Sequence, residues 1–165
     1  MVGLINQVLY RADINVWKLA GFCVTSRGDG SRGIETPHSR GTKGFRAPEL
    51  LQPQALYTNK VDIWAFGCVT YELVTKRRAF ESDFATQAYA HSWGELPVVV
   101  DSERVGGMLE RIIRVALDRE PQNRPSAHDL SVIIQANIAG IDTSYAFRSK
   151  ASDTTTRTTH ILHKC

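Results

Sequence analysis

The stretch KVDIWAFGCVTYELVT, residues 60–75, decides the fold. After its first residue it carries only two charged side chains, Asp62 and Glu72, and apolar residues occupy every side of the helix that it would form. A helix that is apolar all round is buried in a protein core. At about 1.5 Å per residue this helix would be roughly 24 Å long, which is shorter than a membrane span. The sequence therefore predicts a central buried helix at residues 60–75, with the rest of the chain packed around it.

Length and composition are those of a globular domain. The 165 residues can form one domain with its own core, and 42% of them are hydrophobic and 22% charged. The formal net charge is +3, and no run of five or more Lys and Arg residues occurs. This charge pattern predicts neither a nucleic-acid partner nor a membrane partner.

The cysteines indicate a reducing compartment. Cys23, Cys68 and Cys165 are odd in number and form no C-x-x-C pair, and no signal peptide precedes them. We therefore expect a cytoplasmic protein with three free thiols, of which Cys68 is inert packing inside the buried helix. His160 and His163 lie near Cys165 in a polar tail, which is a poor setting for a metal site.

The remaining chain is predicted to form short elements separated by loops. Apolar residues recur with helical spacing in the second half, and β-prone runs lie near the start. The predicted elements are a β-hairpin from 7–10 and 16–20 with Asp13 and Asn15 in its turn, a long polar loop at 23–40, a helix entry at 45–51, helices at 83–91, 105–116 and 126–138, and a charged turn at 118–123. The stripe of the last helix is Leu130, Ile133, Ile134 and Ile138.

Three motifs follow one another along the chain. GTKGFRAPE (residues 41–49) comes first, DIWAFGC (62–68) begins thirteen residues after Glu49, and PQNRPS (121–126) follows later. In this order, with helices between them, they resemble the end of the activation segment, the D-x-W-x-x-G helix start and the late arginine motif of the protein kinase family. The resemblance covers residues 6–138.

The resemblance implies a mainly α fold. The expected architecture is a protein-kinase-like C-terminal lobe with a short β-hairpin at its N-terminus and the central helix at about 60–75, the N-terminal lobe being absent from this chain. The expected domains are a partial kinase domain at 1–140, from the end of the catalytic loop onward, and a polar, disordered tail at 141–165.

The resemblance also assigns structural roles to three charged residues. It implies a buried ion pair between Glu49 and Arg124 that ties the activation segment to the base of the lobe. Removing one partner of such a pair strands a buried charge. From the residues alone Asp62 is an N-terminal capping charge, because a carboxylate there faces unpaired N–H groups. By resemblance it instead accepts hydrogen bonds from the backbone of the catalytic loop.

The catalytic residues of the family are incomplete. NQVL at residues 6–9 resembles the end of the catalytic loop, so Asn6 matches the asparagine that binds a metal ion in the family. The H-R-D-L-x-x-x-N spacing places the catalytic Asp at Met1, and no intact catalytic residue is expected. The spacing Gly28-x-Gly30-x-x-Gly33 offers no substitute for the Gly-rich phosphate loop, because no strand precedes it.

The metal-binding motif also departs from the family. KLAGFC at residues 18–23 follows the second predicted strand where the family has K-[IL]-[AS]-D-F-G, so Gly21 occupies the position of the metal-binding Asp. By resemblance the cofactors are ATP and Mg²⁺. Mg²⁺ at such sites is held by carboxylate and phosphate oxygens, and glycine has no carboxylate. We therefore expect binding of both at the Asn6 and Gly21 positions to be weak or absent.

The hydroxyl groups between Gly21 and Glu49 are candidate regulatory or substrate-contacting groups. Thr42 stands where serine/threonine-specific members carry a Thr near the substrate, which favours that branch over the tyrosine-specific one. In active kinases, basic residues capture such hydroxyls once they are phosphorylated and so order the segment. The catalytic-loop arginine that helps to receive the phosphate is not in this chain, so we do not expect regulatory phosphorylation here. The candidate hydroxyls are Ser26, Ser31, Thr36, Ser39 and Thr42.

Three functional hypotheses follow. In the first, the chain is a pseudokinase or kinase-derived module that binds other proteins and has lost transfer of the ATP γ-phosphate to Ser/Thr. In the second, it is a truncated representation of an active serine/threonine protein kinase. In the third, it is a gene remnant that does not hold a fold, because a lone lobe exposes apolar surface.

Overall fold

The computed structural model describes residues 8–20, 22, 25–26, 32–36, 41–96 and 102–140. The chain divides into two compact units, Met1–Ser126 and Ala127–Cys165. The described residues contain four α-helices and two small antiparallel sheets, which agrees with the mainly α prediction.

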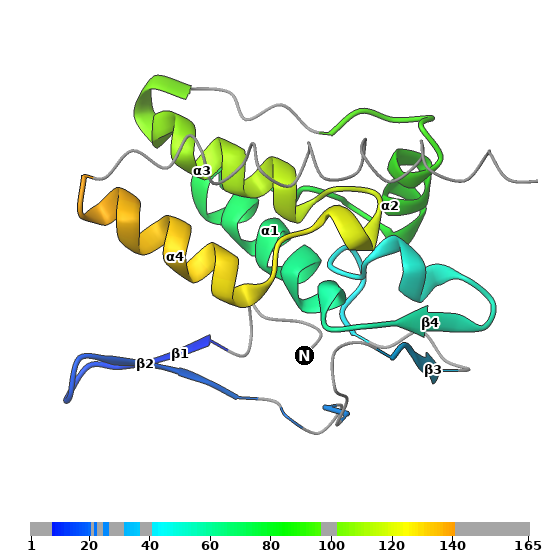
Figure 1. The fold of residues 1–165 in the computed structure, drawn as a ribbon, viewed down its shortest axis with the longest axis horizontal. Coiled ribbons are helices and arrows are strands. Elements are labelled where there is room, and N and C mark those ends of the chain that lie inside the picture. The colour runs from blue at the N-terminus through cyan, green and yellow to red at the C-terminus, as the bar shows by residue number, and fades with distance from the viewer. Residues whose placement is uncertain are drawn as a thin grey trace, which may run out of the picture. The chain divides into compact units, whose positions relative to one another are not determined.

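The predicted central helix is present as α1 (Lys60–Thr75), which lies among the other elements of the first unit (Figure 1). Trp64 and Ala65 are fully buried, and Cys68 and Tyr71 are nearly so. The burial ends in the last turn, where Leu73 is 66% exposed. Lys76 closes the helix in the left-handed conformation, with φ of 59°, and its N–H donates to the carbonyl of Glu72 at 2.8 Å.

Helix α3 (Ser102–Ala116) packs on α1 as its amphipathic sequence predicts, and it begins three residues before the first residue of the predicted apolar stripe, Val105. Gly67 explains how closely the two elements approach. A Cβ atom at this position would lie 2.9 Å from the Cβ of Ala116 and 2.9 Å from Cδ2 of Leu117. Such contacts are shorter than carbon atoms tolerate, so the D-x-W-x-x-G glycine is required by packing.

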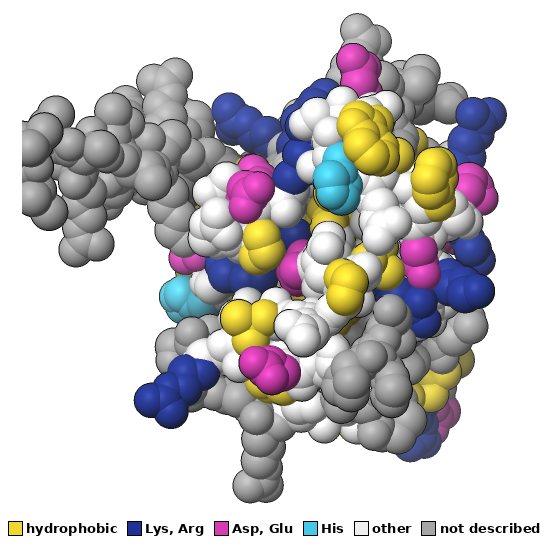
Figure 2. Space-filling view, turned by 90° about the vertical axis from the view of Figure 1, so that its right-hand side faces the viewer, with side chains coloured by type: hydrophobic (Ala, Val, Ile, Leu, Met, Phe, Trp, Pro, Cys, Tyr) yellow, Lys and Arg dark blue, Asp and Glu magenta, His cyan; other side chains and the backbone are white. Residues whose placement is uncertain are grey.

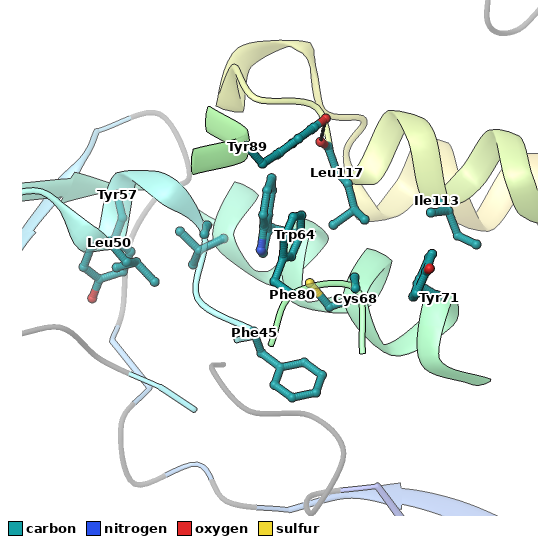
Figure 3. Close-up of a cluster of buried hydrophobic side chains, with 13 residues drawn as sticks. Phe45, Leu50, Tyr57, Trp64, Cys68, Tyr71, Phe80, Tyr89, Ile113 and Leu117 are labelled. Atoms are coloured by element: carbon teal, nitrogen blue, oxygen red, sulfur yellow. Dashed lines mark hydrogen bonds between the residues drawn. The ribbon is translucent and has the colours of Figure 1, made fainter. Parts of the chain in front are cut away.

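An aromatic cluster fills the space between α1 and helix α2 (Asp83–Ala90), as Figure 3 shows. The Trp64 and Phe80 rings stack with centroids 5.3 Å apart, and the Tyr89 ring lies 5.4 Å from that of Phe80. Ser82 caps α2, because its hydroxyl accepts the N–H of Ala85 at 3.2 Å. The observed helix is the predicted one, shorter by one residue at its C-terminus.

The predicted hairpin is present as β1 (Val8–Arg11) and β2 (Val16–Leu19), which pair antiparallel with Val8 opposite Leu19. Asn15 takes the positive φ, 52°, that the turn requires.

A second sheet was not predicted. Strand β3 (Ile34–Thr36) lies inside the stretch predicted to be a loop, and it pairs antiparallel with β4 (Ala55–Tyr57). Each strand has only three residues, which is too short for an alternating pattern to be recognisable.

Two other predicted segments are 3-10 helices. The helix entry at 45–51 is the four-residue η3 (Pro48–Leu51), with proline in its first turn as expected. The charged turn contains η4 (Pro121–Asn123).

The second unit contains helix α4 (Ala127–Ile138). Leu130 and Ile133 of the predicted stripe are buried, whereas Ile138 is 79% exposed. The prediction for Ile138 was therefore wrong, because the helix ends at this residue. The predicted tail at 141–165 lies outside the described residues.

Candidate functional site

The site is built around Arg124, whose side chain is fully buried. Its guanidinium binds Glu49 through two parallel hydrogen bonds, of 2.6 Å to Oε1 and 3.0 Å to Oε2. It also donates to three backbone carbonyls, those of Lys60, Asp118 and Arg119, at 3.1, 2.8 and 3.3 Å. A guanidinium has five N–H donors, and all five are used here. The buried charge is therefore fully compensated, which is the condition under which burial of an arginine is tolerated.

The Trp64 ring of helix α1 packs against the Arg124 guanidinium. The Cζ atom of Arg124 lies 4.9 Å from the centre of the Trp64 ring, a cation–π arrangement. The ammonium group of Lys60 in turn donates to the carbonyl of Arg124. The first turn of α1 is thus joined to Arg124 by hydrogen bonds in both directions.

A second anchor holds the 41–46 turn against the start of α2. Arg46 and Asp83 form a half-buried ion pair of 2.8 Å, and the Nε atom of Arg46 donates to the carbonyl of Gly41 at 2.8 Å. The other carboxylate oxygen of Asp83 accepts the backbone N–H of Gly44 at 3.1 Å. One carboxylate therefore fixes both the backbone and a side chain of this turn.

Gly44 is required at the centre of the turn for two reasons. Its φ of +80° is in the left-handed region, which side chains disfavour. A Cβ atom would also lie 2.6 Å from the carbonyl oxygen of Phe80. The turn is therefore pressed against the chain that links α1 to α2.

Two buried groups beside the site have raised pKa values. Burial raises the pKa of the Cys68 thiol far above its usual range. Burial also raises the pKa of the Tyr89 hydroxyl, although the neighbouring Arg119 guanidinium opposes this. Both groups remain protonated at neutral pH, and the Tyr89 hydroxyl donates to the carbonyl of Leu117 at 2.9 Å. The free, buried thiol of Cys68 agrees with the prediction that it is inert packing.

The structure brings some of the predicted site residues together. Glu49 and Arg124 are in contact, as the resemblance to the kinase family implies. Asp62 is half-buried in the first turn of α1, where its own N–H donates to the carbonyl of Asn59 at 3.1 Å. Its predicted partners in the catalytic loop lie outside the described residues, as do Met1, Asn6 and Gly21.

The candidate hydroxyl groups differ in exposure. Thr42 is exposed at the edge of the turn, and its carbonyl accepts the N–H of Phe45 at 3.1 Å. Thr36 is buried, with 3% of its surface exposed, so its hydroxyl is not accessible to a modifying enzyme in this conformation. Ser26 is exposed and accepts a hydrogen bond of 3.4 Å from the Tyr57 hydroxyl. Ser31 and Ser39 fall outside the described part of the chain.

Sequence reasoning missed the Arg46–Asp83 anchor and the Lys60 contact. Arg46 stands inside the recognised 41–49 motif, and Asp83 follows the helix cap Ser82, so both lay within segments already singled out. Nothing in the sequence pairs two residues 37 positions apart. In the part of the chain described by the structure, no helix has the length and apolarity to cross a membrane, and no three His, Cys, Asp or Glu side chains form a possible metal site.

Comparison with known proteins decides the family. The model of the protein kinase domain family matches residues 6–132. The chain belongs to the protein kinase family. This kinase chain is 34% identical over 91 residues to the probable serine/threonine-protein kinase nek3 of Dictyostelium discoideum, covering 54% of this chain and 8% of that protein. It is 35% identical over 91 residues to the serine/threonine-protein kinase Nek9 of Mus musculus, covering 54% and 9%.

A longer match extends over more of the kinase chain. Another probable serine/threonine-protein kinase of Dictyostelium discoideum is 31% identical over 119 residues, which is 72% of this chain and 13% of that protein. The chain thus spans a small part of the length of the curated relatives that it matches.

The family uses ATP and Mg²⁺, and the donor set of this chain can be tested against that requirement. Asn6 would offer one amide oxygen, whereas Gly21 offers no side-chain oxygen at the position of the metal-binding carboxylate. Mg²⁺ demands near-octahedral oxygen coordination in which protein carboxylates take part. At the two positions that the family resemblance assigns to metal ligands, the sequence thus supplies one amide oxygen and no carboxylate, and we derive no catalytic step through the metal ion.

Proposed function

We propose that this chain is the C-terminal lobe of a serine/threonine-type kinase domain whose phosphoryl transfer is impaired and whose function is to bind other proteins in the cytoplasm. The observation that carries the proposal is Gly21, which replaces a metal-binding carboxylate inside a region that otherwise matches the family. A longer chain would not restore this carboxylate. The free thiol of Cys68 is consistent with a reducing compartment.

The lobe assignment is supported by the position of the three motifs in the fold. The end of the 41–49 segment contacts the late arginine motif through Glu49 and Arg124, and both meet the start of α1 at Lys60. Three motifs that are far apart in the sequence thus meet at one buried charge. Three chance matches to the motifs would not be expected to lie in contact around one side chain.

Protein binding is supported by two features together, the loss of the metal-binding carboxylate at position 21 and the presence of two ion pairs that hold the 41–49 segment. The Arg46–Asp83 and Glu49–Arg124 pairs hold the 41–49 segment at two points. A surface held in one conformation loses little entropy when a partner binds, so such anchoring favours recognition. The exposed Thr42 lies on this surface.

The test joins the natural sequence and Gly21→Asp upstream to the N-terminal lobe of a serine/threonine kinase, which carries the rest of the family's nucleotide site, and compares nucleotide binding and phosphoryl transfer in the two proteins. We expect no ATP-dependent thermal shift that requires Mg²⁺ in the natural chain, and a Mg²⁺-dependent shift in Gly21→Asp. Asn6→Ala in the Gly21→Asp background is the control, because it should abolish the gained shift.

The alternative is an active serine/threonine protein kinase, which the names of the relatives favour. Transfer of labelled phosphate by the natural protein, lost on Asn6→Ala and unaffected by Gly21→Asp, would establish this alternative and refute the proposal.

A further inference from the structure

Four basic residues lie close to the anchored 41–46 turn. Lys76, Arg77 and Arg78 follow α1 directly, and all three are exposed. Lys43, also exposed, lies on the turn itself between Thr42 and Gly44. We call these four residues the basic cluster.

Two contacts join the two segments that carry the basic cluster. The Cζ atom of Arg78 lies 5.7 Å from the centre of the buried Phe45 ring, two residues from Lys43. Gly44 closely approaches the carbonyl of Phe80, two residues after Arg78. The 41–46 turn and the 76–80 chain therefore run against each other, with the basic side chains along their exposed edges.

The local backbone holds the cluster in place. Lys76 is the left-handed cap of α1, and the hydroxyl of Thr75 accepts the N–H of Arg77 at 3.2 Å while it donates to the carbonyl of Tyr71 at 2.9 Å. Cations at a helix C-terminus also stabilise the helix dipole, which is the simplest reason for Lys76. That reason does not extend to Lys43, which belongs to a different segment.

Nearby carboxylates do not neutralise the basic cluster. Asp83 is engaged with Arg46 and with the N–H of Gly44. Glu72, on the last turn of α1, is half-buried, and Glu81 is exposed. Within the described segments 41–46 and 72–83, the four cations of the cluster thus have two remaining carboxylates near them in sequence, which leaves these segments with an excess of positive charge.

We propose that the basic cluster binds acidic peptide segments of partner proteins that also carry an apolar side chain. The apolar requirement comes from Leu73, which is 66% exposed in the last turn of α1, three residues before Lys76. An acidic peptide matches both the charge and this exposed leucine, whereas a nucleic-acid backbone would match the charge alone. The inference deepens the proposed function by naming the chemistry of the partner. It holds whether or not the partner is also a phosphorylation substrate.

The test uses the full 165-residue chain and a fluorescent peptide of twelve residues, nine of them Asp or Glu, with one central Leu. Fluorescence anisotropy should show binding that weakens as salt is raised, because exposed ion pairs are screened. Arg77→Glu/Arg78→Glu should weaken binding by about tenfold or more, and Leu73→Ala by a few-fold. Arg77→Gln/Lys43→Gln provides a second, milder variant should the double reversal fail to fold.

Arg114→Glu is the matched control, since Arg114 is an exposed arginine on α3 paired with Glu110 rather than with the 41–46 turn. This variant should bind the peptide as the natural chain does. The inference is overturned if the natural chain does not bind the acidic peptide, if the Arg114 and Arg77/Arg78 variants weaken binding equally, or if single-stranded DNA or anionic vesicles bind more tightly than the peptide. Its outcome is independent of the Mg²⁺ and ATP measurements that test the proposed function.

Discussion

Replacing Glu49 with alanine tests whether the Glu49–Arg124 pair holds the fold together. Glu49→Ala leaves a fully buried guanidinium with two of its five donors unpaired. Removing one partner of a buried ion pair costs about 3–5 kcal/mol. The Glu49 side chain is 14% exposed, so water can reach part of the space that it leaves, which places the expected cost near the lower end, at about 3 kcal/mol. For a domain of this size, that lowers Tm by about 10 °C.

The assay is chemical and thermal unfolding of the full chain, followed by circular dichroism. Glu110→Ala is the matched control, because Glu110 also binds an arginine through two hydrogen bonds but does so at the surface, where Arg114 is 57% exposed. Surface pairs of this spacing contribute about 0.3–0.5 kcal/mol. Equal losses for the two variants, or a loss below about 1 kcal/mol for Glu49→Ala, would refute the reasoning. A natural chain without a cooperative transition would instead favour the gene-remnant hypothesis.

Three further predictions concern packing, the second anchor and pH. Gly67→Ala should lower the free energy of unfolding in urea by about 1–3 kcal/mol, because the new Cβ atom meets Ala116 of α3. Gly107→Ala should raise it by up to about 1 kcal/mol, because a Cβ atom there meets no atom within 4 Å. Equal effects of the two variants would contradict the close packing of α3 on Gly67. Asp83→Asn loses the ion pair with Arg46 and keeps both trypsin sites of the turn, Lys43 and Arg46, so trypsin should cleave the 41–46 turn about fivefold faster. An unchanged rate would count against the anchor. Burial raises the pKa of the Cys68 thiol in the folded state above the ordinary thiol value of 9.0. As the pH rises above 9.0, the unfolded state therefore loses this proton before the folded state does, and the free energy of unfolding should fall by up to about 1.4 kcal/mol per pH unit. Cys68→Ala should reduce this slope.

Features carried by long stretches of sequence were predictable. The buried helix α1 follows from its apolar residues on all sides, and α2 and α3 follow from helical spacing and capping residues. The Glu49–Arg124 contact could be expected only through the family resemblance, because the two residues are 75 positions apart. No periodic signal connects residues at such a distance.

Features that depend on tertiary contacts were not predictable. Strands β3 and β4 exist because they pair with each other, and three residues carry too little pattern to be recognised alone. Arg46 and Asp83 looked like ordinary charged residues, since their pairing depends on how the 41–46 turn meets α2. Likewise, Gly67 belongs to the D-x-W-x-x-G motif, but only the position of Ala116 in the fold explains why position 67 requires a glycine.

The distance in sequence between Glu49 and Arg124 has a consequence during protein synthesis. Glu49 is made 75 residues before its partner, and at about 5–20 residues per second a ribosome needs roughly 4–15 s to add them. Trp64 is made 60 residues before Arg124, so for roughly 3–12 s of that interval the nascent chain carries the Trp64 ring without the guanidinium that covers it in the finished fold. Chaperones that recognise exposed apolar segments should therefore associate with ribosomes translating this region, and should dissociate once Arg124 has emerged.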